Sequence, residues 1–258
     1  MGLVDRLRRF VTPAPPAARG AAGARAYAVG DIHGRLDLLD RLLEMIDADI
    51  AARPKRRIFL VLLGDLIDRG PDSARVVERL RTYRREGVRM VFLAGNHEEV
   101  MLRIVHGEED VLPSWLKFGG AECLESYGVD SEALKRLDEA SALQRVKAAI
   151  PRDHVAFLES FGDTFRFGDY LFVHAGIRPG LPLEEQHVKD LRWIREPFLG
   201  DSKEHGFIVV HGHTICDSVD QRANRIGIDT GAYMSGNLTA IAIEDDRRWF
   251  LSTGGGDD

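Results

Sequence analysis

The sequence predicts an α/β fold with mainly parallel strand pairing, on three observations. Short apolar runs typical of strands alternate with segments whose apolar residues recur at helical spacing. Several of the strand-like runs end in a cluster of Gly, Asp, Asn or His residues. The chain of 258 residues is long enough for one large domain, and it shows no repeat of about 20–50 residues.

Three strand–helix pairs follow one another in the first part of the chain. The runs 27–29, 57–63 and 88–93 are short and apolar, as buried strands are. Behind them come segments with apolar residues three or four positions apart, which predict helices: Leu36, Leu39, Leu42, Leu43 and Ile46; Val76, Val77, Leu80 and Tyr83; and residues 100–105. Strands that alternate with helices indicate parallel pairing in this half.

Residues 107–160 break the alternation, because they are rich in Glu, Leu, Ala and Lys and lack strand-like runs. We expect them to form a helical insertion. Strands return at 170–173 and 207–210. The last predicted strands, which we expect to be consecutive and antiparallel, are 223–229, 238–243 and 248–252.

The composition narrows the class of protein. A net charge of -6, from 35 basic and 41 acidic residues, gives no electrostatic argument for nucleic-acid binding. Two cysteines are too few for a disulfide framework or a zinc ribbon, so a reducing cytoplasm is the expected setting. No apolar run approaches the roughly 20 residues that span a bilayer.

The N-terminal residues 1–25 are rich in Arg, Ala and Pro and lack the apolar core of a secretory signal. We expect them to form a disordered tail, which leaves residues 26–258 for the folded domain.

Polar residues gather directly behind five predicted strands. In α/β folds, ligands bind at the carboxyl ends of the strands, so these side chains should converge. Oxygen and nitrogen ligands without thiolates suit Mn, Fe or Zn, and a cation would offset the cost of burying so many polar groups together. The residues are Asp31 and His33, Asp65 and Asp68, Asn96 and His97, His174, and His213.

The motifs that contain these residues occur in the order GDIHG, GDLIDRG, GNHE, HAGI and GHT. This ordered set resembles the signature of the calcineurin-like metallophosphoesterases, and in particular the phosphoprotein phosphatase group of the small bacterial and phage type. The segment IDTGAYMSGNLTAIAI resembles the C-terminal strands of the phage-type enzymes. The resemblance covers roughly residues 27–244. It implies two packed mixed β-sheets flanked by helices.

The resemblance also implies a site with two divalent metal ions, of which Mn is the expected species and Fe or Zn are alternatives. Asp31 and His33 would bind the first metal and Asp65 would bridge both. Asn96, His174 and His213 would bind the second. Two such cations, about 3.5–4 Å apart, can hold a bridging hydroxide that attacks the phosphorus directly.

Four further residues receive roles from the same resemblance. Asp68 would orient His97, and His97 would protonate the leaving oxygen as a general acid. Arg69 would hold a phosphate oxygen through its planar fork of donors. A second arginine is expected from the segment LRWIRE, where Arg195 is preferred and Arg192 is the rival.

Three functions remain open at this point. A phosphatase of phosphoserine and phosphothreonine in proteins is preferred, because His33 in GDIHG is often glutamine in the symmetrical tetraphosphate hydrolases. A diadenosine tetraphosphate hydrolase is the alternative. A non-catalytic metal-binding scaffold is disfavoured, because a binding module needs neither a general acid nor its orienting carboxylate. The expected partner is a phosphoprotein or a phosphorylated small molecule.

Overall fold

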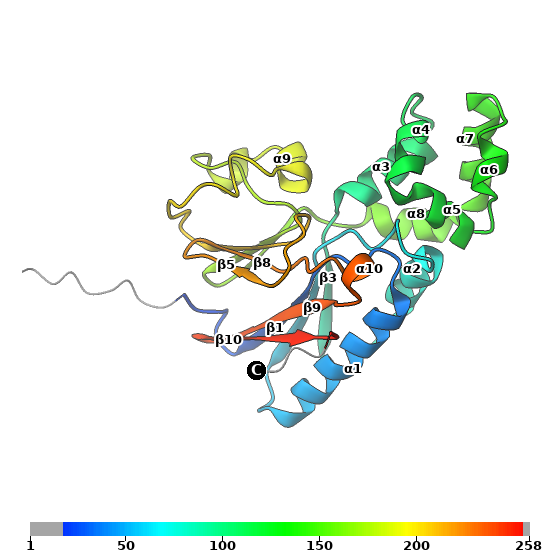
Figure 1. Ribbon diagram of the computed structural model, residues 1–258. Helices are drawn as coiled ribbons and strands as arrows, with labels where there is room; N and C mark the ends of the chain where they lie inside the picture. The colour runs from blue at the N-terminus through cyan, green and yellow to red at the C-terminus, as the bar shows by residue number, and fades with distance from the viewer. Residues whose placement is uncertain (1–17, 255–258) are drawn as a thin grey trace, which may run out of the picture.

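The computed structural model describes residues 18–254, which form two packed five-stranded mixed sheets with helices outside them (Figure 1). The first sheet has the order β10-β9-β1-β2-β3, and the second has the order β4-β5-β6-β8-β7. The strands of the first sheet are β1 (Ala24–Val29), β2 (Arg57–Leu62), β3 (Val88–Phe92), β9 (Thr239–Glu244) and β10 (Arg247–Ser252). Those of the second are β4 (Thr164–Phe167), β5 (Tyr170–Val173), β6 (Ile208–His211), β7 (Asp220–Gln221) and β8 (Arg225–Gly227). This architecture confirms the predicted fold class.

Each sheet contains three neighbouring strands that run parallel to one another. β1, β2 and β3 pair in parallel, as do β5, β6 and β8. The antiparallel strands β9 and β10 extend the first sheet, and β4 and β7 form the two edges of the second. The carboxyl ends of the parallel strands therefore lie at one edge of each sheet.

The prediction for the C-terminal strands was wrong in one respect. Residues 223–229 were expected to precede 238–243 as its antiparallel neighbour, but β8 belongs to the second sheet and pairs with β6. Ile226 and Ile228 are fully buried in the apolar layer between the sheets. The chain then passes through α10 (Ala232–Ser235) to β9 in the first sheet. The apolar pattern alone does not reveal this change of sheet.

Alternate residues of β1 face the two sides of the first sheet. Ala26 and Ala28 pack between the sheets, while Tyr27 and Val29 pack against the helical layer. That layer contains α1 (Leu36–Ala52) and α2 (Ser73–Thr82). On the outer side of the second sheet lie the short turn η2 (Leu183–Glu185) and α9 (Val188–Trp193), whose apolar residues pack on β5 and β6.

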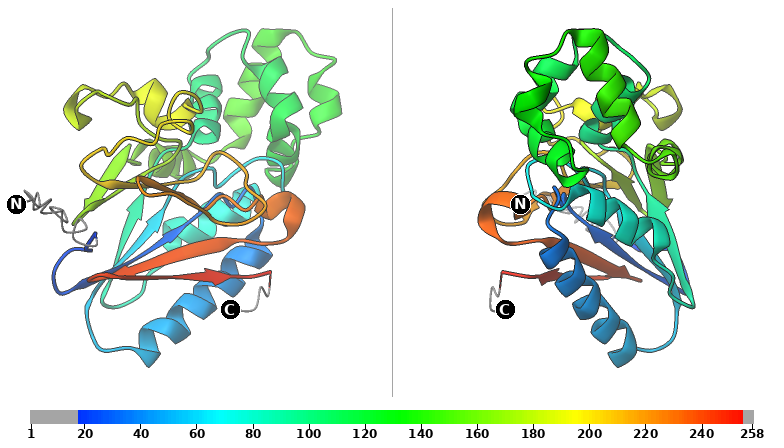
Figure 2. Two further views of the ribbon diagram at one scale, coloured as in Figure 1. Left: turned by 60° about the vertical axis from the view of Figure 1, so that its left-hand side comes forward. Right: turned by 90° about the vertical axis from the view of Figure 1, so that its right-hand side faces the viewer.

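Residues 107–160, all of which are described, contain helices and no strand, and they project from one end of the sheets (Figure 2). The preceding helix α3 (Asn96–Val105) begins inside the GNHE motif. Behind it come α4 (Leu112–Trp115), the π-helical turn η1 (Leu116–Gly120), α5 (Ala121–Ser126), α6 (Ser131–Leu134), α7 (Glu139–Ala149) and α8 (Arg152–Glu159). These helices pack on α2 and α3 and share their apolar core. We call this segment the helical insertion.

The predicted tail of residues 1–25 falls mostly on residues 1–17, which lie outside the described part of the chain. The predicted tail extended too far, because β1 begins at Ala24 and residues 24 and 25 belong to the folded domain. Arg25 is fully buried and forms an ion pair with Glu244 at 2.5 Å, so its charge does not prevent it from lying in a strand. Among the described residues, no helix has both the length and the apolar character needed to cross a bilayer.

Candidate dinuclear metal centre

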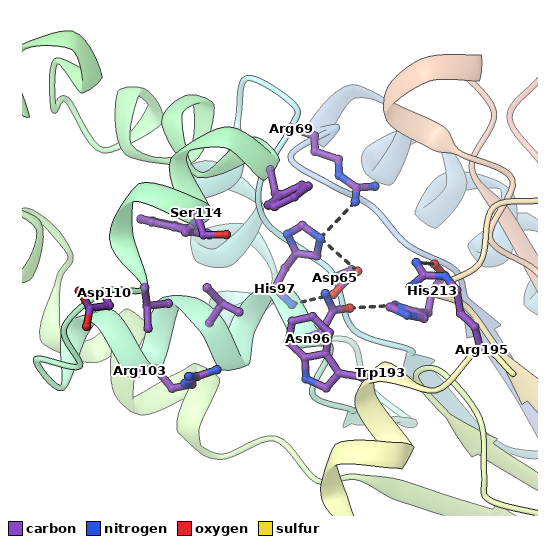
Figure 3. A pocket seen from close by; sticks show the side chains of 14 residues that line it. Asp65, Arg69, Asn96, His97, Arg103, Asp110, Ser114, Trp193, Arg195 and His213 are labelled. Atoms are coloured by element: carbon purple, nitrogen blue, oxygen red, sulfur yellow. Dashed lines mark hydrogen bonds and ion pairs between the residues drawn. The ribbon is translucent and has the colours of Figure 1, made fainter. Parts of the chain in front are cut away.

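The residues predicted at the strand ends meet at one edge of the two sheets. Each follows a strand of a parallel pair, so the pairing itself brings the side chains together. All of them are buried, and Asp65, Asn96, His97 and His213 also line a cleft beside the helical insertion (Figure 3). They are Asp31 and His33 after β1, Asp65 and Asp68 after β2, Asn96 and His97 after β3, His174 after β5, and His213 after β6.

The backbone at these strand ends is strained. His33, Asp65 and His213 have φ values of 47°, 49° and 63°, a left-handed conformation that non-glycine residues rarely adopt. Such conformations cost about 1–3 kcal/mol each and cluster at functional sites. Glycines beside them make room for the carboxylates. A Cβ on Gly95 would lie 2.2 Å from Asp65 Oδ1, so the GNHE glycine is required by close approach.

One group of side chains converges on the amide oxygen of Asn96. His174 Nε2 lies 3.0 Å and His213 Nδ1 lies 2.9 Å from Asn96 Oδ1. His174 Nδ1 donates to the carbonyl oxygen of Leu63 at 2.9 Å, which leaves the lone pair of the neutral ring on Nε2. Asp65 Oδ1 is 3.5 Å from the same Nε2. Oxygen and nitrogen lone pairs that face one another suit a divalent cation, and Asp65, His174 and His213 lie close enough to hold one.

A second group contains His33, Asp65 and His97, which also lie close enough to hold a metal ion. His33 Nδ1 donates to the carbonyl oxygen of Ile67 at 2.7 Å, and its Nε2 lies 3.6 Å from Asp65 Oδ2. Asp65 is thus common to both groups, which is the arrangement expected of a bridging ligand. The donor atoms are oxygen and nitrogen throughout, so the two groups fit borderline divalent cations such as Mn, Fe or Zn.

Asp31 lies beside this second group and contacts the backbone of the first. Its carboxylate accepts the backbone N–H of His213 at 3.0 Å. Burial, followed by the negative charges of Asp229 and Asp65, raises the pKa of Asp31 well above its usual value. Burial also raises the pKa of Asp229, to about 6. A neighbouring cation would favour the ionised form of both carboxylates.

The electrostatics keep the three imidazoles in their ligand form. Burial lowers the pKa of His33 and of His213 to about 3, and it lowers the pKa of His174 as well. Neutral imidazole is the form that binds metals. Burial alone would raise the pKa of Asp65, but the surrounding histidines outweigh it and lower this pKa below its usual range.

The imidazole of His97 lies between two carboxylates. Its Nδ1 lies 2.5 Å from Asp68 Oδ2, and its Nε2 lies 3.8 Å from Asp65 Oδ2. Burial alone would lower the pKa of His97, but the charge of Asp65 and the hydrogen bond to Asp68 raise it to about 9. The raised pKa favours the protonated imidazole, which is the form required of a general acid.

The structure separates the two candidate arginines of LRWIRE. Arg195 lines the cleft and donates to the carbonyl oxygen of His213 at 3.4 Å. Arg192 instead forms ion pairs with Asp163 at 2.7 Å and Glu99 at 3.3 Å, and it is not among the lining residues. Arg69 lines the cleft opposite, with Nη2 3.3 Å from His97 Nε2 (Figure 3).

The cleft has a volume of about 540 Å³ and extends from the metal-ligand candidates along α3 to the helical insertion. Arg69, Arg195 and His97 surround its polar end. The aromatic residues Trp115, Phe118 and Trp193 also line the cleft. Phe118 is 66% exposed, so the cleft offers an apolar surface beside its charged floor.

Four residues of the site lie outside the predicted set of metal ligands, general acid, orienting carboxylate and arginines. Glu98 accepts the backbone N–H groups of Asp65, Leu66 and Gly95 at 2.8–2.9 Å and so shapes the loop that carries Asp65. Asp229 follows β8 in the sequence IDTG. An aspartate near a glycine directly behind a strand also occurs at other strand ends of the site, so this pattern could have identified it. The other two residues are Tyr233, which packs on His33 and Arg69, and Trp115, which donates to Asp68.

His211 directly precedes the GHT motif. It is the last residue of β6 and is fully buried, with its ring against Phe198. Its Nδ1 lies 3.0 Å from the carbonyl oxygen of Gly212. His211 is absent from both groups of possible metal ligands within the described residues.

Comparison with known proteins agrees with this geometry. The chain is 26% identical to "Serine/threonine-protein phosphatase 2" of Salmonella typhimurium over 228 residues, which cover 84% of this chain and 92% of the relative. It is also 26% identical to "Bis(5'-nucleosyl)-tetraphosphatase PrpE [asymmetrical]" of Anoxybacillus flavithermus over 234 residues, 83% of this chain and 88% of the relative. The relatives thus carry names of both substrate classes.

Among solved structures, a "putative diadenosine tetraphosphatase" matches with a TM-score of 0.63 and 21% identity, covering 93% of this chain and 100% of that chain. At this identity the match supports the fold alone. Residues 24–235 match the family described as Calcineurin-like phosphoesterase, and this range contains every strand-end residue of the site. The chain therefore belongs to the calcineurin-like phosphoesterase family of hydrolases.

Proposed function

We propose that the chain is a metal-dependent phosphatase that hydrolyses phosphoserine and phosphothreonine in proteins. The observation that carries the proposal is the position of the His97–Asp68 pair. It lies next to two groups of possible metal ligands and at the floor of a cleft that also contains two arginines. A binding module would need the ligands but not the acid. A cleft with all of these parts is suited to displacement at phosphorus.

We assign the metal ligands as the family resemblance implies, with Asp31 in place of His97, which belongs to the compact second group in the structure. Asp31, His33 and Asp65 would hold one cation, and Asp65 would share a second with Asn96, His174 and His213. His97 lies near the first cation site but is engaged by Asp68, so we assign it to proton transfer rather than to metal binding. When bound, the two divalent cations supply a nucleophile at neutral pH and polarise the phosphoryl oxygens. We expect Mn, with Fe or Zn as alternatives.

The side chains of this protein bind the substrate and move one proton. Arg69 and Arg195 flank the polar end of the cleft, where their guanidinium groups would hold the non-reacting oxygens of the phosphoryl group. The alkoxide that departs from serine or threonine is strongly basic and needs a proton as the bond breaks. His97 Nε2 faces the cleft and would donate that proton, while Asp68 at Nδ1 fixes the orientation of the ring.

A dinucleoside polyphosphate hydrolase is the second candidate, and one observation favours it. Phe118 and Trp193 line the cleft beyond its charged floor, and aromatic side chains of this kind can stack a purine base. The shape of the cleft suits a segment of a protein substrate as well as it suits a dinucleotide. The phosphoprotein assignment rests on His33 in GDIHG, because the relatives carry names of both substrate classes. The free cysteines Cys123 and Cys216 favour a reducing cytoplasm as the setting.

The deciding experiment compares the two substrate classes under one metal condition. The purified protein is stripped of metal, Mn is added back, and kcat/KM is measured for phosphoserine and phosphothreonine peptides and for diadenosine tetraphosphate. We expect the phosphopeptides to be preferred. A value at least about tenfold higher for the dinucleotide, equivalent to about 1.4 kcal/mol of transition-state preference, would replace the proposal by the second candidate.

A further inference from the structure

We propose that Trp115, in the helical insertion, positions the general acid by holding Asp68, so that the insertion is part of the catalytic machinery as well as a wall of the cleft. This inference rests on the proposed role of His97 and extends it to a residue outside the strand-end motifs. Trp115 is a positioning residue in this scheme, because its proposed effect on proton transfer passes through Asp68 and His97.

Trp115 and Asp68 form a direct hydrogen bond between two buried side chains. Trp115 Nε1 donates to Asp68 Oδ2 at 2.8 Å, and the same oxygen lies 2.5 Å from His97 Nδ1. An indole N–H can only donate, so the direction of this bond is not in doubt. Asp68 is fully buried and Trp115 is 3% exposed. One carboxylate oxygen is thus fixed between a donor on α3 and a donor on α4, two helices that approach it from different directions.

A backbone contact beside the indole attaches the insertion to the same loop. The N–H of Arg69 donates to the carbonyl oxygen of Gly119 at 3.0 Å, and Gly119 has a φ of +110°. A Cβ on Gly119 would lie 2.6 Å from Arg69 N, and one on Gly120 would lie 2.3 Å from the Trp115 ring. The two glycines therefore allow the π-helical turn to close tightly over the loop.

The loop needs such support because its conformation is strained. Asp68 and Arg69 are consecutive non-glycine residues with φ values of 72° and 66°. Strained residues of this kind persist only where their surroundings hold them. Asp68 Oδ1 has no hydrogen-bond partner among residues 18–254, so the orientation of this carboxylate depends on the contacts of Oδ2. Trp115 supplies one of the two side-chain donors to that oxygen.

Loss of the indole N–H should affect one step selectively. Without it, the Asp68 carboxylate is free to rotate toward other partners, and the His97 ring loses its fixed direction. Proton donation to the leaving oxygen then becomes less efficient. Trp115 makes no hydrogen bond to any residue assigned to the metals, so metal content and phosphate binding should be preserved. A substrate whose leaving group needs no proton should be hydrolysed nearly as fast as before.

The test compares Trp115→Phe with a matched control, Trp249→Phe. Trp249 lies on β10, and its indole donates to Asp49 Oδ2 at 3.3 Å, so the control also removes an indole-to-carboxylate bond. In the Mn-loaded full chain, kcat and KM are measured with phenyl phosphate, a poor leaving group, and with 2,4-dinitrophenyl phosphate, a good one. For Trp115→Phe we expect kcat to fall roughly tenfold on phenyl phosphate, as for loss of a hydrogen bond to a charged group. On the dinitrophenyl ester it should fall less than about twofold, and KM and metal content should not change.

The control should leave both rates unchanged. An equal loss of kcat on both substrates would mean that Trp115 is merely structural, and no loss on either would mean that Asp68 needs no second donor. Either result overturns the inference. A double-mutant cycle with Asp68→Asn adds a second criterion. If Trp115 acts through Asp68, Trp115→Phe should cost less than about twofold in the Asp68→Asn background, whereas an additive loss would contradict the proposal.

A spectroscopic arm keeps the inference testable if Trp115→Phe does not fold or if the wild-type chain hydrolyses neither ester. The second case would count against the proposed function rather than against the contact. The three indole N–H resonances of the otherwise unmodified chain are recorded by ¹H–¹⁵N NMR with and without Asp68→Asn. We expect one indole resonance to shift strongly while the others stay in place. Three unchanged resonances would show that the Trp115–Asp68 bond is absent in solution.

Discussion

His97 Nδ1 lies 2.5 Å from Asp68 Oδ2, with both side chains buried at the floor of the cleft and Asp65 on the other side of the imidazole. The pair therefore places the imidazole of His97 between Asp68 and the group that contains Asp65. The hydrogen bond to Asp68 is our reason for assigning His97 to proton transfer rather than to metal binding. The predictions below follow from it and from its surroundings.

Replacing His97 by Asn should remove the acid and leave the six proposed metal ligands in place. We expect kcat on a phosphoserine peptide to fall about 10²–10⁴-fold with unchanged metal content. The loss should be much smaller on 2,4-dinitrophenyl phosphate, because its leaving group departs without a proton. If the losses on the two substrates are equal, His97 has a positional role instead.

The pH dependence of the reaction should report the raised pKa of His97. Because the acid is active in its protonated form, kcat on a poor leaving group should fall as the pH rises through the pKa of His97, which the hydrogen bond to Asp68 raises. A pH profile of kcat from 6 to about 10.5 covers this limb. In the His97→Asn variant the limb should disappear, and its persistence there would assign it to another group.

Arg195 and Arg192 provide a matched pair three residues apart. Arg195→Ala should lower kcat/KM about 10–10³-fold, because it removes a charged donor from the polar end of the cleft. Arg192→Ala should have little effect on kcat/KM, since its guanidinium is engaged by Asp163 and Glu99. A crippled Arg192→Ala beside a normal Arg195→Ala would reverse the assignment.

Glu98 should be a stability determinant of the site. Glu98→Ala would leave three buried backbone N–H groups without their acceptor, which should lower the free energy of unfolding by at least about 3 kcal/mol. The adjacent Glu99→Ala is the control, because it removes only half-buried contacts to Arg192 and Trp193 and should cost less than about 1 kcal/mol. Urea denaturation of both variants measures the difference, and equal costs would show that the three bonds are not needed.

The sequence was sufficient for the fold class and for the convergence of the strand-end residues. The reason is physical: parallel strands end at one edge, so polar residues such as Asp65 and His174 directly behind them must meet. Their roles as metal ligands stay predictions. The sheet to which β8 belongs could not be predicted, because the sequence of a strand as short as Arg225–Gly227 is compatible with either sheet.

Contacts that depend on side-chain direction could not be predicted from the sequence either. Arg192 and Arg195 lie on either side of the end of α9, and only the direction of the chain there decides which one enters the cleft. Trp115 lies 47 residues from Asp68, and its role depends on how the insertion folds back over the loop. No local pattern encodes a contact of that kind.

The central claim is that Asp65 joins two metal sites on which hydrolysis depends. Elemental analysis and activity measured on one preparation test it most directly, before and after treatment with excess chelator and after addition of Mn. The account predicts about two metal ions per chain, loss of hydrolysis on chelation and its return with Mn. Full activity in excess chelator, with no metal bound to the chain, would contradict it.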